Sequence, residues 1–334
     1  MKLEPFSLPL SRPLKTASGT IESREGFLVW VTIDGFGGVG EATPLPGWTE
    51  SLETCERTLR SVEEPRSALE SDELADAPAA RHGLSLAVFD ATSRAVGEPL
   101  YRHLGGTGRR SRVPVNATVG DGTAAETAAA AEAATREGYS AVKLKVGARE
   151  PTADIGRLEA VRRRCPAVEL RVDANGAWTY ETARRLLPTL SELDVAIVEQ
   201  PLSAAKLSEH AQLRGRGVEI ALDESLIEHG AETVLSADAA DLLVCKPMAI
   251  GGVDRAREVI GMARDTGGDA IVTTTIDGAI ARAGAVHLAA SVPDIRACGL
   301  ATGDLLGSDL RTDVPTVEGG SIAVPQGKGN IPPP

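Results

Sequence analysis

Six side chains suited to acid–base or metal chemistry lie at regular intervals along the middle of this chain. Three are carboxylates that end apolar runs, and three are lysines that stand before and after them: Lys143, Lys145, Asp173, Glu199, Asp223 and Lys246. From Lys145 onward, the steps between them are 28, 26, 24 and 23 residues. Each step has the length of one strand followed by one helix. In a parallel (β/α) barrel, this spacing brings all six to the C-terminal mouth, where such barrels hold their active sites.

The three carboxylates predict a metal site. Asp173, Glu199 and Asp223 offer hard oxygen ligands with no Cys or His beside them, which suits Mg²⁺ and also Mn²⁺. A single carboxylate at a strand end more often caps a helix or pairs with a base. Three of them at one mouth repel each other unless a cation lies between them. Glu224 follows Asp223 directly, and we expect it to ligate as well or to hold a lysine from behind.

The lysines predict a general base. Lys143 and Lys145 alternate with apolar residues, so both point to the same side of one strand. Two ammonium groups so near each other repel. We expect this repulsion, together with burial, to lower the pKa of one of them toward neutrality. The alternative is that the two lysines lie on a solvent-facing strand and have no catalytic role. Lys246 is expected across the barrel, on the opposite face of the substrate; its alternative role is a structural ion pair.

The elements that must position these groups follow from the apolar pattern. Short β-branched runs that end in Gly, Pro, Asn or Ser predict strands, and apolar residues at three- and four-residue spacing predict helices between them. The expected strands are residues 113–119, 141–147, 168–175, 196–201, 219–225, 241–247, 270–276 and 295–301. The expected helices are residues 123–137, 152–164, 179–190, 206–214, 231–237, 253–266 and 279–291. Eight strands in this range are the number that closes one barrel.

The first 110 residues predict a separate α+β cap. Residues 27–33 and 38–42 are expected to form antiparallel strands joined by the turn Asp34-Gly-Phe-Gly37, and helices are expected at 50–62 and 80–97. Residues 111–315 would form the barrel, and the tail 316–334 would pack back on the cap. The predicted fold class is therefore α/β, a (β/α)7β-type TIM barrel with an N-terminal α+β capping domain.

Composition excludes several classes of function. A net charge of −12 argues against a nucleic-acid partner, and no apolar run reaches membrane-spanning length. No secretory leader is visible, which predicts a cytoplasmic protein. The four cysteines are scattered and are read as structural thiols. Only seven of the 35 basic residues are lysines, which fits either a high-salt cytoplasm or GC-rich coding. A small-molecule carboxylate is the expected partner, and formation of a homo-oligomer is left open.

These residues together resemble the enolase superfamily, and specifically its muconate-lactonizing subgroup. The resemblance covers nearly the whole chain: a cap, Lys-x-Lys on the second barrel strand, acids on the next three and a Lys on the sixth. Several stretches look like the o-succinylbenzoate synthases of menaquinone biosynthesis. These stretches are Gly-Glu-Ala-Thr-Pro-Leu-Pro-Gly at 40–47, Arg-Val-Asp-Ala-Asn-Gly-Ala-Trp at 171–178, Ala-Leu-Asp-Glu-Ser-Leu at 221–226 and Ala-Cys-Gly-Leu at 297–300.

The resemblance implies a mechanism and further site residues. A substrate carboxylate would bind Mg²⁺, Lys145 would remove the α-proton and return it to the departing hydroxyl, and Lys246 would stabilise the enediolate while Lys143 tunes Lys145. The other implied site residues are of two kinds. Thr274, Thr275 and the backbone at Gly299 would hold the second substrate carboxylate, while Arg171 and Asn175 would support the metal site, Asn175 beside the substrate. Cap loops at about 14–24 and 44–51 would close over the mouth.

Other activities stay open at this point. Sister enzymes include N-acylamino acid racemases, dipeptide epimerases and muconate cycloisomerases. None of the five histidines falls at a predicted strand end, which argues against a His base. The last predicted strand lacks the Asp-x-Asp with which dipeptide epimerases bind the substrate ammonium. Outside the superfamily, a barrel lysine could form a Schiff base in an aldolase, and a binding protein that has lost catalysis is the remaining alternative.

Overall fold

The N-terminal part of the computed structural model is a three-stranded antiparallel sheet packed against helices. The structure describes residues 1–16 and 19–332. The sheet has the order β1 (Lys2–Thr16), β2 (Gly19–Ile33), β3 (Phe36–Ala42), and the helices are α1 (Leu52–Ser61), α2 (Pro65–Glu70), α3 (Pro78–Val96) and α4 (Leu100–His103). Alternate residues of β2, from Phe27 to Ile33, are buried against the cap helices. The predicted antiparallel pair and its turn are confirmed, with Asp34 and Gly35 both at positive φ, as the tight turn requires.

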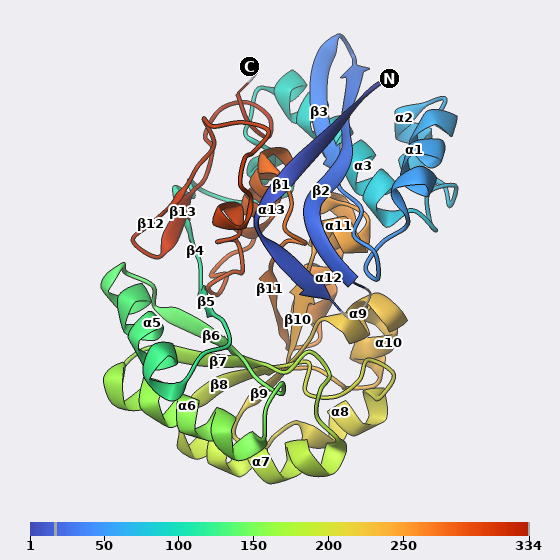
Figure 1. Ribbon diagram of the computed structural model, residues 1–334. Coiled ribbons are helices and arrows are strands. Elements are labelled where there is room, and N and C mark those ends of the chain that lie inside the picture. Colours follow the sequence, from blue (N-terminus) through green and yellow to red (C-terminus); the bar gives the residue numbers. More distant parts are fainter. Residues whose placement is uncertain (17–18, 333–334) are drawn as a thin grey trace.

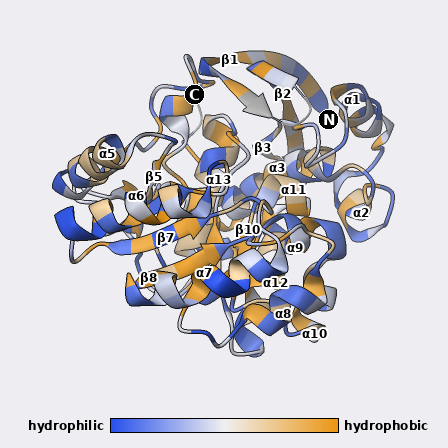
Figure 2. Ribbon diagram, turned by 60° about the horizontal axis from the view of Figure 1, so that its bottom comes forward, coloured by the Kyte–Doolittle hydropathy of each residue, from blue (hydrophilic) through white to orange (hydrophobic). Residues whose placement is uncertain are grey.

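A curled parallel sheet forms the second part (Figure 1). Its seven strands are β5 (Ala117–Val119), β6 (Ala141–Lys145), β7 (Glu169–Asp173), β8 (Val195–Glu199), β9 (Glu219–Leu222), β10 (Leu242–Cys245) and β11 (Asp269–Val272), which neighbour one another in chain order. The sheet is largely buried, and Figure 2 shows β8, with the residues Val-Ala-Ile-Val-Glu, mostly in hydrophobic colours. This is the α/β fold class that the sequence predicts.

Helical segments follow the strands, and the longer ones cover the outside of the sheet. They are α5 (Ala124–Arg136), α6 (Pro151–Arg164), α7 (Tyr180–Glu192), α8 (Leu207–Leu213), α9 (Glu224–His229), α10 (Ala231–Ser236), α11 (Pro247–Ile250), α12 (Val253–Asp265), α13 (Ala279–Ala290) and the 3₁₀ turn η1 (Gly303–Leu305). The short helices α9 and α11 begin directly at strand ends and were not expected. No helix in residues 1–16 and 19–332 has the length and apolar character needed to cross a membrane.

Two predicted strands differ from the structure. The run 113–119 is split into β4 (Arg112–Pro114), which pairs antiparallel with β13 (Ser321–Ala323), and β5, which pairs with β6. The run 295–301 forms no continuous strand; it makes isolated parallel bridges from Cys298 to Val115 and from Gly299 to Thr273. The N–H of Asn116 donates to Cys298 O at 2.9 Å, and the N–H of Gly299 donates to Val272 O at 2.9 Å. The eighth segment therefore joins the two edges of the sheet through a few hydrogen bonds.

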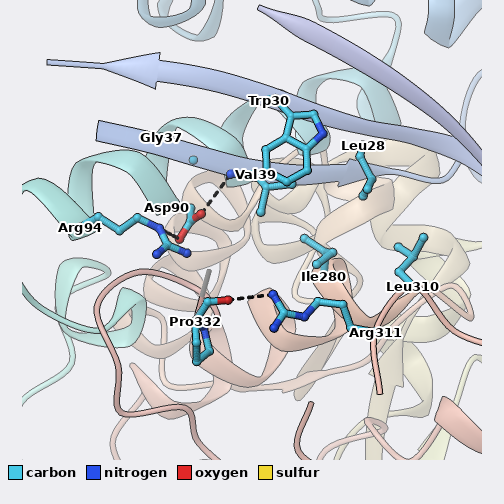
Figure 3. Close-up of a pocket in the computed structure, with 11 residues that line it drawn as sticks. Leu28, Trp30, Gly37, Val39, Asp90, Arg94, Ile280, Leu310, Arg311 and Pro332 are labelled. Atoms are coloured by element: carbon cyan, nitrogen blue, oxygen red, sulfur yellow. Dashed lines mark hydrogen bonds and ion pairs between the residues drawn. The ribbon is translucent and has the colours of Figure 1, made fainter. Parts of the chain in front are cut away.

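The C-terminal segment joins both parts of the molecule. β12 (Val317–Glu318) and β13 extend β4 into a small antiparallel sheet. Farther on, the N–H of Asn330 donates to Asp90 Oδ1 of α3 at 2.7 Å, and the N–H of Leu100 donates to Gly329 O at 2.9 Å. Beside this junction, a largely apolar cavity of about 450 Å³ lies between the cap strands, α13 and the tail, with Trp30 and Ile280 in its wall (Figure 3).

Candidate active site

The parallel strands bring the six predicted side chains to one mouth. Asp173 ends β7, Glu199 ends β8, Asp223 follows β9 and Lys246 follows β10. Lys145 pairs in register with Asp173, and Asp173 with Glu199, so the three lie on neighbouring strand ends. One cavity of about 260 Å³ is lined by all six together with Asn175, Thr273, Thr274, Thr275, Thr302 and residues of the cap. Spacing along the chain has thus become proximity in space.

Lysines and carboxylates alternate within this cavity. Lys143 Nζ donates to both oxygens of Glu199 at 2.8 Å and lies 3.3 Å from Asp173 Oδ2. Lys145 Nζ donates to Asp173 Oδ2 at 2.5 Å and to Asn175 Oδ1 at 2.7 Å. The Lys145 side chain is 43% exposed, whereas that of Lys143 is 14% exposed. Lys145 is therefore the lysine of this pair that faces the open cavity.

A separate ion pair joins the ends of β9 and β10. Lys246 Nζ donates to Asp223 Oδ2 at 2.5 Å, and the ring of Trp48 from the cap lies 3.4 Å from the same ammonium. β10, which precedes Lys246, lies four strands from β6 in the sheet order, so Lys246 and Lys145 approach the cavity from opposite sides. Trp48 was expected only as part of a closing loop. Its place in Pro-Gly-Trp, a turn with an apolar ring at its tip, is the signal that could have identified it.

Burial and charge shift the pKa values in opposite directions. Burial alone lowers the pKa of Lys143, but the ion pairs with Glu199 and Asp173 outweigh it, and the pKa is raised. Lys143 is therefore not the lysine whose pKa the repulsion was expected to lower. Burial raises the pKa of Asp173, yet the two lysines hold it well below its usual range. Burial and the neighbouring carboxylates raise the pKa of Glu199 to about 7 against the attraction of Lys143.

The three carboxylates suit a divalent cation, although in this structure they form ion pairs with the lysines. No three His, Cys, Asp or Glu side chains in residues 1–16 and 19–332 are gathered closely enough to form a metal cage as they stand. All three predicted ligands are buried, and Asp223 Oδ1 is a buried oxygen without a hydrogen-bond partner. Burial raises the pKa of Asp223 as well. Three buried carboxylates at one mouth need positive charge between them, and hard oxygen donors of this kind fit Mg²⁺.

The predicted supporting residues take different places. Asn175 lies between the predicted ligands and Glu224: its N–H donates to Asp173 Oδ1 at 3.0 Å, and its Nδ2 donates to Glu224 Oε1 at 3.0 Å. Glu224 therefore holds Asn175 rather than a lysine. Arg171 is buried lower in the barrel, where it donates to Glu169 Oε1 at 2.6 Å and to Ala297 O at 2.7 Å. Neither Glu169 nor Ala297 is a predicted metal ligand, so we assign Arg171 to closure of the barrel.

The predicted substrate contacts also differ from one another. Thr274 and Thr275 line the cavity; Thr274 Oγ1 lies 2.9 Å from Thr302 Oγ1, and Thr275 Oγ1 donates to Asp277 Oδ1 at 2.5 Å. Gly299 is outside the cavity lining, and both its backbone groups serve barrel closure, since its carbonyl accepts from Thr273 Oγ1 at 2.8 Å. Within the predicted loop 14–24, Leu14 lines the cavity, and residues 17 and 18 lie outside the described residues.

Family comparison covers most of the chain. Residues 126–330 match the family described as enolase C-terminal domain-like, and residues 1–91 match the MenC N-terminal domain. Similar relatives include the L-Ala-D/L-Glu epimerase of Bacillus subtilis (30% identical; 96% of this chain, 92% of the relative) and muconate cycloisomerase 1 of Rhodococcus opacus (31%; 97% and 92%). The o-succinylbenzoate synthase of Desulfotalea psychrophila is 29% identical over 95% of this chain and 96% of its own.

Solved structures have the same architecture. A substrate-liganded complex of the Bacillus subtilis L-Ala-D/L-Glu epimerase matches with a TM-score of 0.88 at 28% identity, over 98% of this chain and 96% of that one. A dipeptide epimerase from Enterococcus faecalis, complexed with Mg and the dipeptide L-Leu-L-Tyr, matches with a TM-score of 0.88 at 25% identity, over 98% and 97%. Relatives with three different activities are thus similar to a comparable degree. Family matches over both parts of the chain and these full-length likenesses show that the chain belongs to the enolase superfamily.

Proposed function

We propose that the chain is a Mg²⁺-dependent o-succinylbenzoate synthase, a hydro-lyase of menaquinone biosynthesis that dehydrates a cyclohexadiene carboxylate. One observation carries the choice of a substrate without an amino group. The carboxylates that line the cavity are Asp173, Glu199 and Asp223, all of which belong to the predicted metal site. The wall beyond them carries threonine hydroxyls. Among the described residues that line the cavity, a substrate ammonium would find no separate anionic partner, whereas carboxylate and hydroxyl groups would find donors.

The residues of the chain divide the chemistry among them. Asp173, Glu199 and Asp223 would hold Mg²⁺, whose positive charge stabilises the negative charge that develops on the substrate carboxylate as the α-proton leaves. Lys145 Nζ takes that proton, because it is the more exposed lysine of its pair, and Asn175 Oδ1, which accepts from it, orients its side chain. The same ammonium then gives the proton to the departing hydroxyl, which leaves as water, and the ring becomes aromatic.

The other two lysines remain charged in this scheme. Lys143 is buried against Glu199 and Asp173, and its raised pKa keeps it protonated, so it fixes the carboxylates and supplies positive potential beside Lys145. Lys246 faces the substrate from the opposite side and stabilises the enediolate electrostatically. The cap supplies Leu14, Leu45 and Trp48 to the cavity, and these side chains exclude water from the reacting face.

A racemase or epimerase is the second candidate. Lys145 and Lys246 stand on opposite sides of one cavity, which is the arrangement that removal of a proton from one face and its return to the other requires. The similarity to the Bacillus subtilis epimerase, at 30% identity, also favours it. N-acylamino acids suit this cavity better than free dipeptides, because an acylated nitrogen carries no charge. A muconate cycloisomerase remains the third candidate within the superfamily.

The test measures dehydration of the cyclohexadiene precursor by ultraviolet absorbance, with and without Mg²⁺. Loss of Lys145 in Lys145→Ala should lower kcat by about 100- to 10,000-fold, the range expected for a general base. Lys206→Ala, at an exposed lysine on the edge of α8, is the matched control and should keep wild-type activity. Parallel assays at low and high KCl test whether the low lysine content reflects a high-salt cytoplasm.

Other outcomes would assign the chain elsewhere. Racemisation of N-succinyl amino acids without dehydration would contradict the synthase and support the second candidate. Activity that survives a chelator, together with borohydride trapping of a lysine, would support an aldolase. Absence of turnover with every substrate would support a binding protein.

A further inference from the structure

The loop that carries Trp48 is held firmly against the mouth of the barrel. Within it, the N–H groups of Trp48 and Thr49 both donate to Leu45 O at 3.0 Å, and the N–H of Leu45 donates to Thr49 Oγ1 at 2.8 Å. At its end, Glu50 accepts from the N–H groups of Ala79 and Ala80 at the start of α3, at 3.0 and 2.8 Å. At its start, Pro44 O accepts from Arg24 Nη1 at 2.9 Å. The loop is therefore closed on itself and anchored at both ends, and it presents the indole of Trp48 in a fixed place.

This indole faces the ammonium of Lys246. The distance from Lys246 Nζ to the ring centroid is 3.4 Å, well within the range of cation–π attraction. The same ammonium donates to Asp223 Oδ2. Lys246 thus lies between a carboxylate below and an aromatic face above, and only 11% of its side chain is exposed. A four-carbon side chain that would otherwise sample several rotamers is confined to one position.

The two partners of Lys246 are not equivalent. Asp223 is one of the proposed Mg²⁺ ligands. An oxygen that binds the metal would bind the ammonium of Lys246 less strongly. The Trp48 ring is a neutral partner, and it does not compete for a cation that carboxylates bind. When Asp223 serves the metal, the ring remains as the contact that keeps the ammonium aimed at the cavity.

We propose that Trp48 is a positioning residue for Lys246: the cap, through one aromatic face, fixes the lysine that faces the substrate opposite Lys145. Trp48 also lines a neighbouring polar cavity of about 550 Å³ with Asn175 and Glu224. The ring therefore stands between the reaction cavity and this second space, and its removal gives Lys246 room to leave. The kinetic part of this proposal rests on the proposed function; the positional part does not.

The first test measures the freedom of Lys246 directly. Reductive methylation of the full chain by formaldehyde and cyanoborohydride, followed by peptide mass spectrometry, gives the labelling rate of each lysine. We expect Trp48→Leu to raise the rate at Lys246 at least 5-fold, while Trp48→Phe, which keeps an aromatic face, stays within about 2-fold of wild type. Lys206, whose side chain is 54% exposed, should not change in the same samples and controls for the dose of reagent. Equal rates at Lys246 in the wild type and Trp48→Leu would overturn the proposal.

The second test separates positioning from a simple lid. Trp48→Leu should lower kcat about 10-fold and change KM by less than about 3-fold, and Trp48→Phe should keep most of kcat. Pro46→Ala, at an exposed position of the same loop, controls for disturbance of the loop. In a Lys246→Met background, Trp48→Leu should add no further loss. A multiplied loss, or a raised KM at constant kcat, would show that the ring acts on the substrate and would overturn the proposal.

The proposed function and the proposed role of Trp48 can be rejected independently. If the wild-type chain does not dehydrate the cyclohexadiene carboxylate, the proposed function is wrong, and the labelling comparison still decides whether Trp48 holds Lys246. If dehydration proceeds and labelling does not respond to Trp48→Leu, the function stands and the positioning role is wrong.

Discussion

At the scale of single residues, ion pairs between lysines and carboxylates determine the electrostatics at the mouth of the barrel. Repulsion between Lys143 and Lys145 was expected to dominate, because a strand places them on one face. Each ammonium instead has its own carboxylate at 2.8 Å or less. Opposite charges at that distance attract more strongly than like charges farther apart repel, so Lys143 becomes harder to deprotonate. The sequence shows the spacing of like charges but not which partner each one reaches.

A second buried charge, outside this site, gives a prediction at the same scale. Glu41 of β3 is fully buried and accepts from Gly278 N–H at 2.6 Å and Ala281 N–H at 2.9 Å, at the start of α13. Burial raises its pKa to about 7, the charge of Asp277 adds to the rise, and the hydrogen bonds from Thr43, Ala281 and Gly278 oppose it. Because the folded pKa lies above the unfolded value of 4.5, folding binds a proton at Glu41 between these two values.

Stability from this group is therefore full below pH 4.5 and is lost as the pH rises through 7. The loss is about 3 kcal/mol for a shift of this size. Glu41→Gln cannot ionise, so we expect the difference in unfolding free energy between wild type and variant to move by about this amount from pH 4.5 to 8. Urea unfolding across the pH range measures it. Glu25→Gln, at an exposed position of β2, should show no such trend. A constant difference between wild type and Glu41→Gln would contradict the raised pKa.

At the scale of elements, the sequence predicts best where one strand has one partner on each side. The strand with Lys143 and Lys145 was expected at 141–147 and is observed as β6, Ala141–Lys145. The predicted strand 113–119 fails because its two halves have different partners. Arg112–Pro114 pairs with the distant C-terminal segment, and Ala117–Val119 pairs with β6. A periodicity in residue types carries no information about a partner 200 residues away.

The same reason limits prediction of the site. Residues at strand ends, such as Asp173 and Glu199, could be placed from spacing alone. Residues whose roles depend on what faces them could not: Arg171 shares a strand with Asp173, yet it reaches Ala297 at 2.7 Å across the barrel. Gly299 is taken up by the bridge to Thr273. Trp48 comes from another part of the chain, and only the docking of the cap places it over Lys246.

The start of α3 gives a prediction for one element. This helix begins at Pro78, and Ala77 before it offers no side-chain cap. Its free N–H groups at Ala79 and Ala80 are instead satisfied by Glu50, 29 and 30 residues earlier. A carboxylate at a helix N-terminus satisfies free donors and favours the helix dipole. Glu50→Ala should lower the unfolding free energy by about 1–2 kcal/mol.

Hydrogen exchange then identifies the segments in which Glu50→Ala lowers the stability. In Glu50→Ala we expect faster exchange at residues 45–50 and in the first turn of α3, because the loop and the helix share this contact. Glu53→Ala, at an exposed position in the first turn of α1, is the control and should leave both segments unchanged. A loss of stability without faster exchange in the loop would mean that Glu50 serves the helix alone.

At the scale of the whole molecule, the tail, the cap sheet and helix α3 meet at one buried carboxylate. Asp90 of α3 accepts from Val39 N–H of the cap sheet at 3.0 Å, from Arg94 Nε at 3.0 Å and from Asn330 N–H of the tail at 2.7 Å. Asp90 is fully buried beside the apolar cavity of Figure 3. Burial raises its pKa, and Arg94 opposes that rise. One side chain thus connects three segments that are distant in the sequence.

Asp90→Asn keeps the shape of the side chain and removes its charge. The amide has one acceptor where the carboxylate has two, so an N–H of Val39 or Asn330 loses its partner, and Arg94 loses its counter-charge. Breaking a buried ion pair from one side costs about 3–5 kcal/mol, and we expect a fall in the unfolding free energy of this size. The tail should respond first, with faster hydrogen exchange and proteolysis at 329–332 before the barrel helices respond. Asp76→Asn, exposed on the cap, should change neither. Equal acceleration over the barrel and the tail would show that Asp90 stabilises the molecule as one unit and does not specifically hold its C-terminal segment.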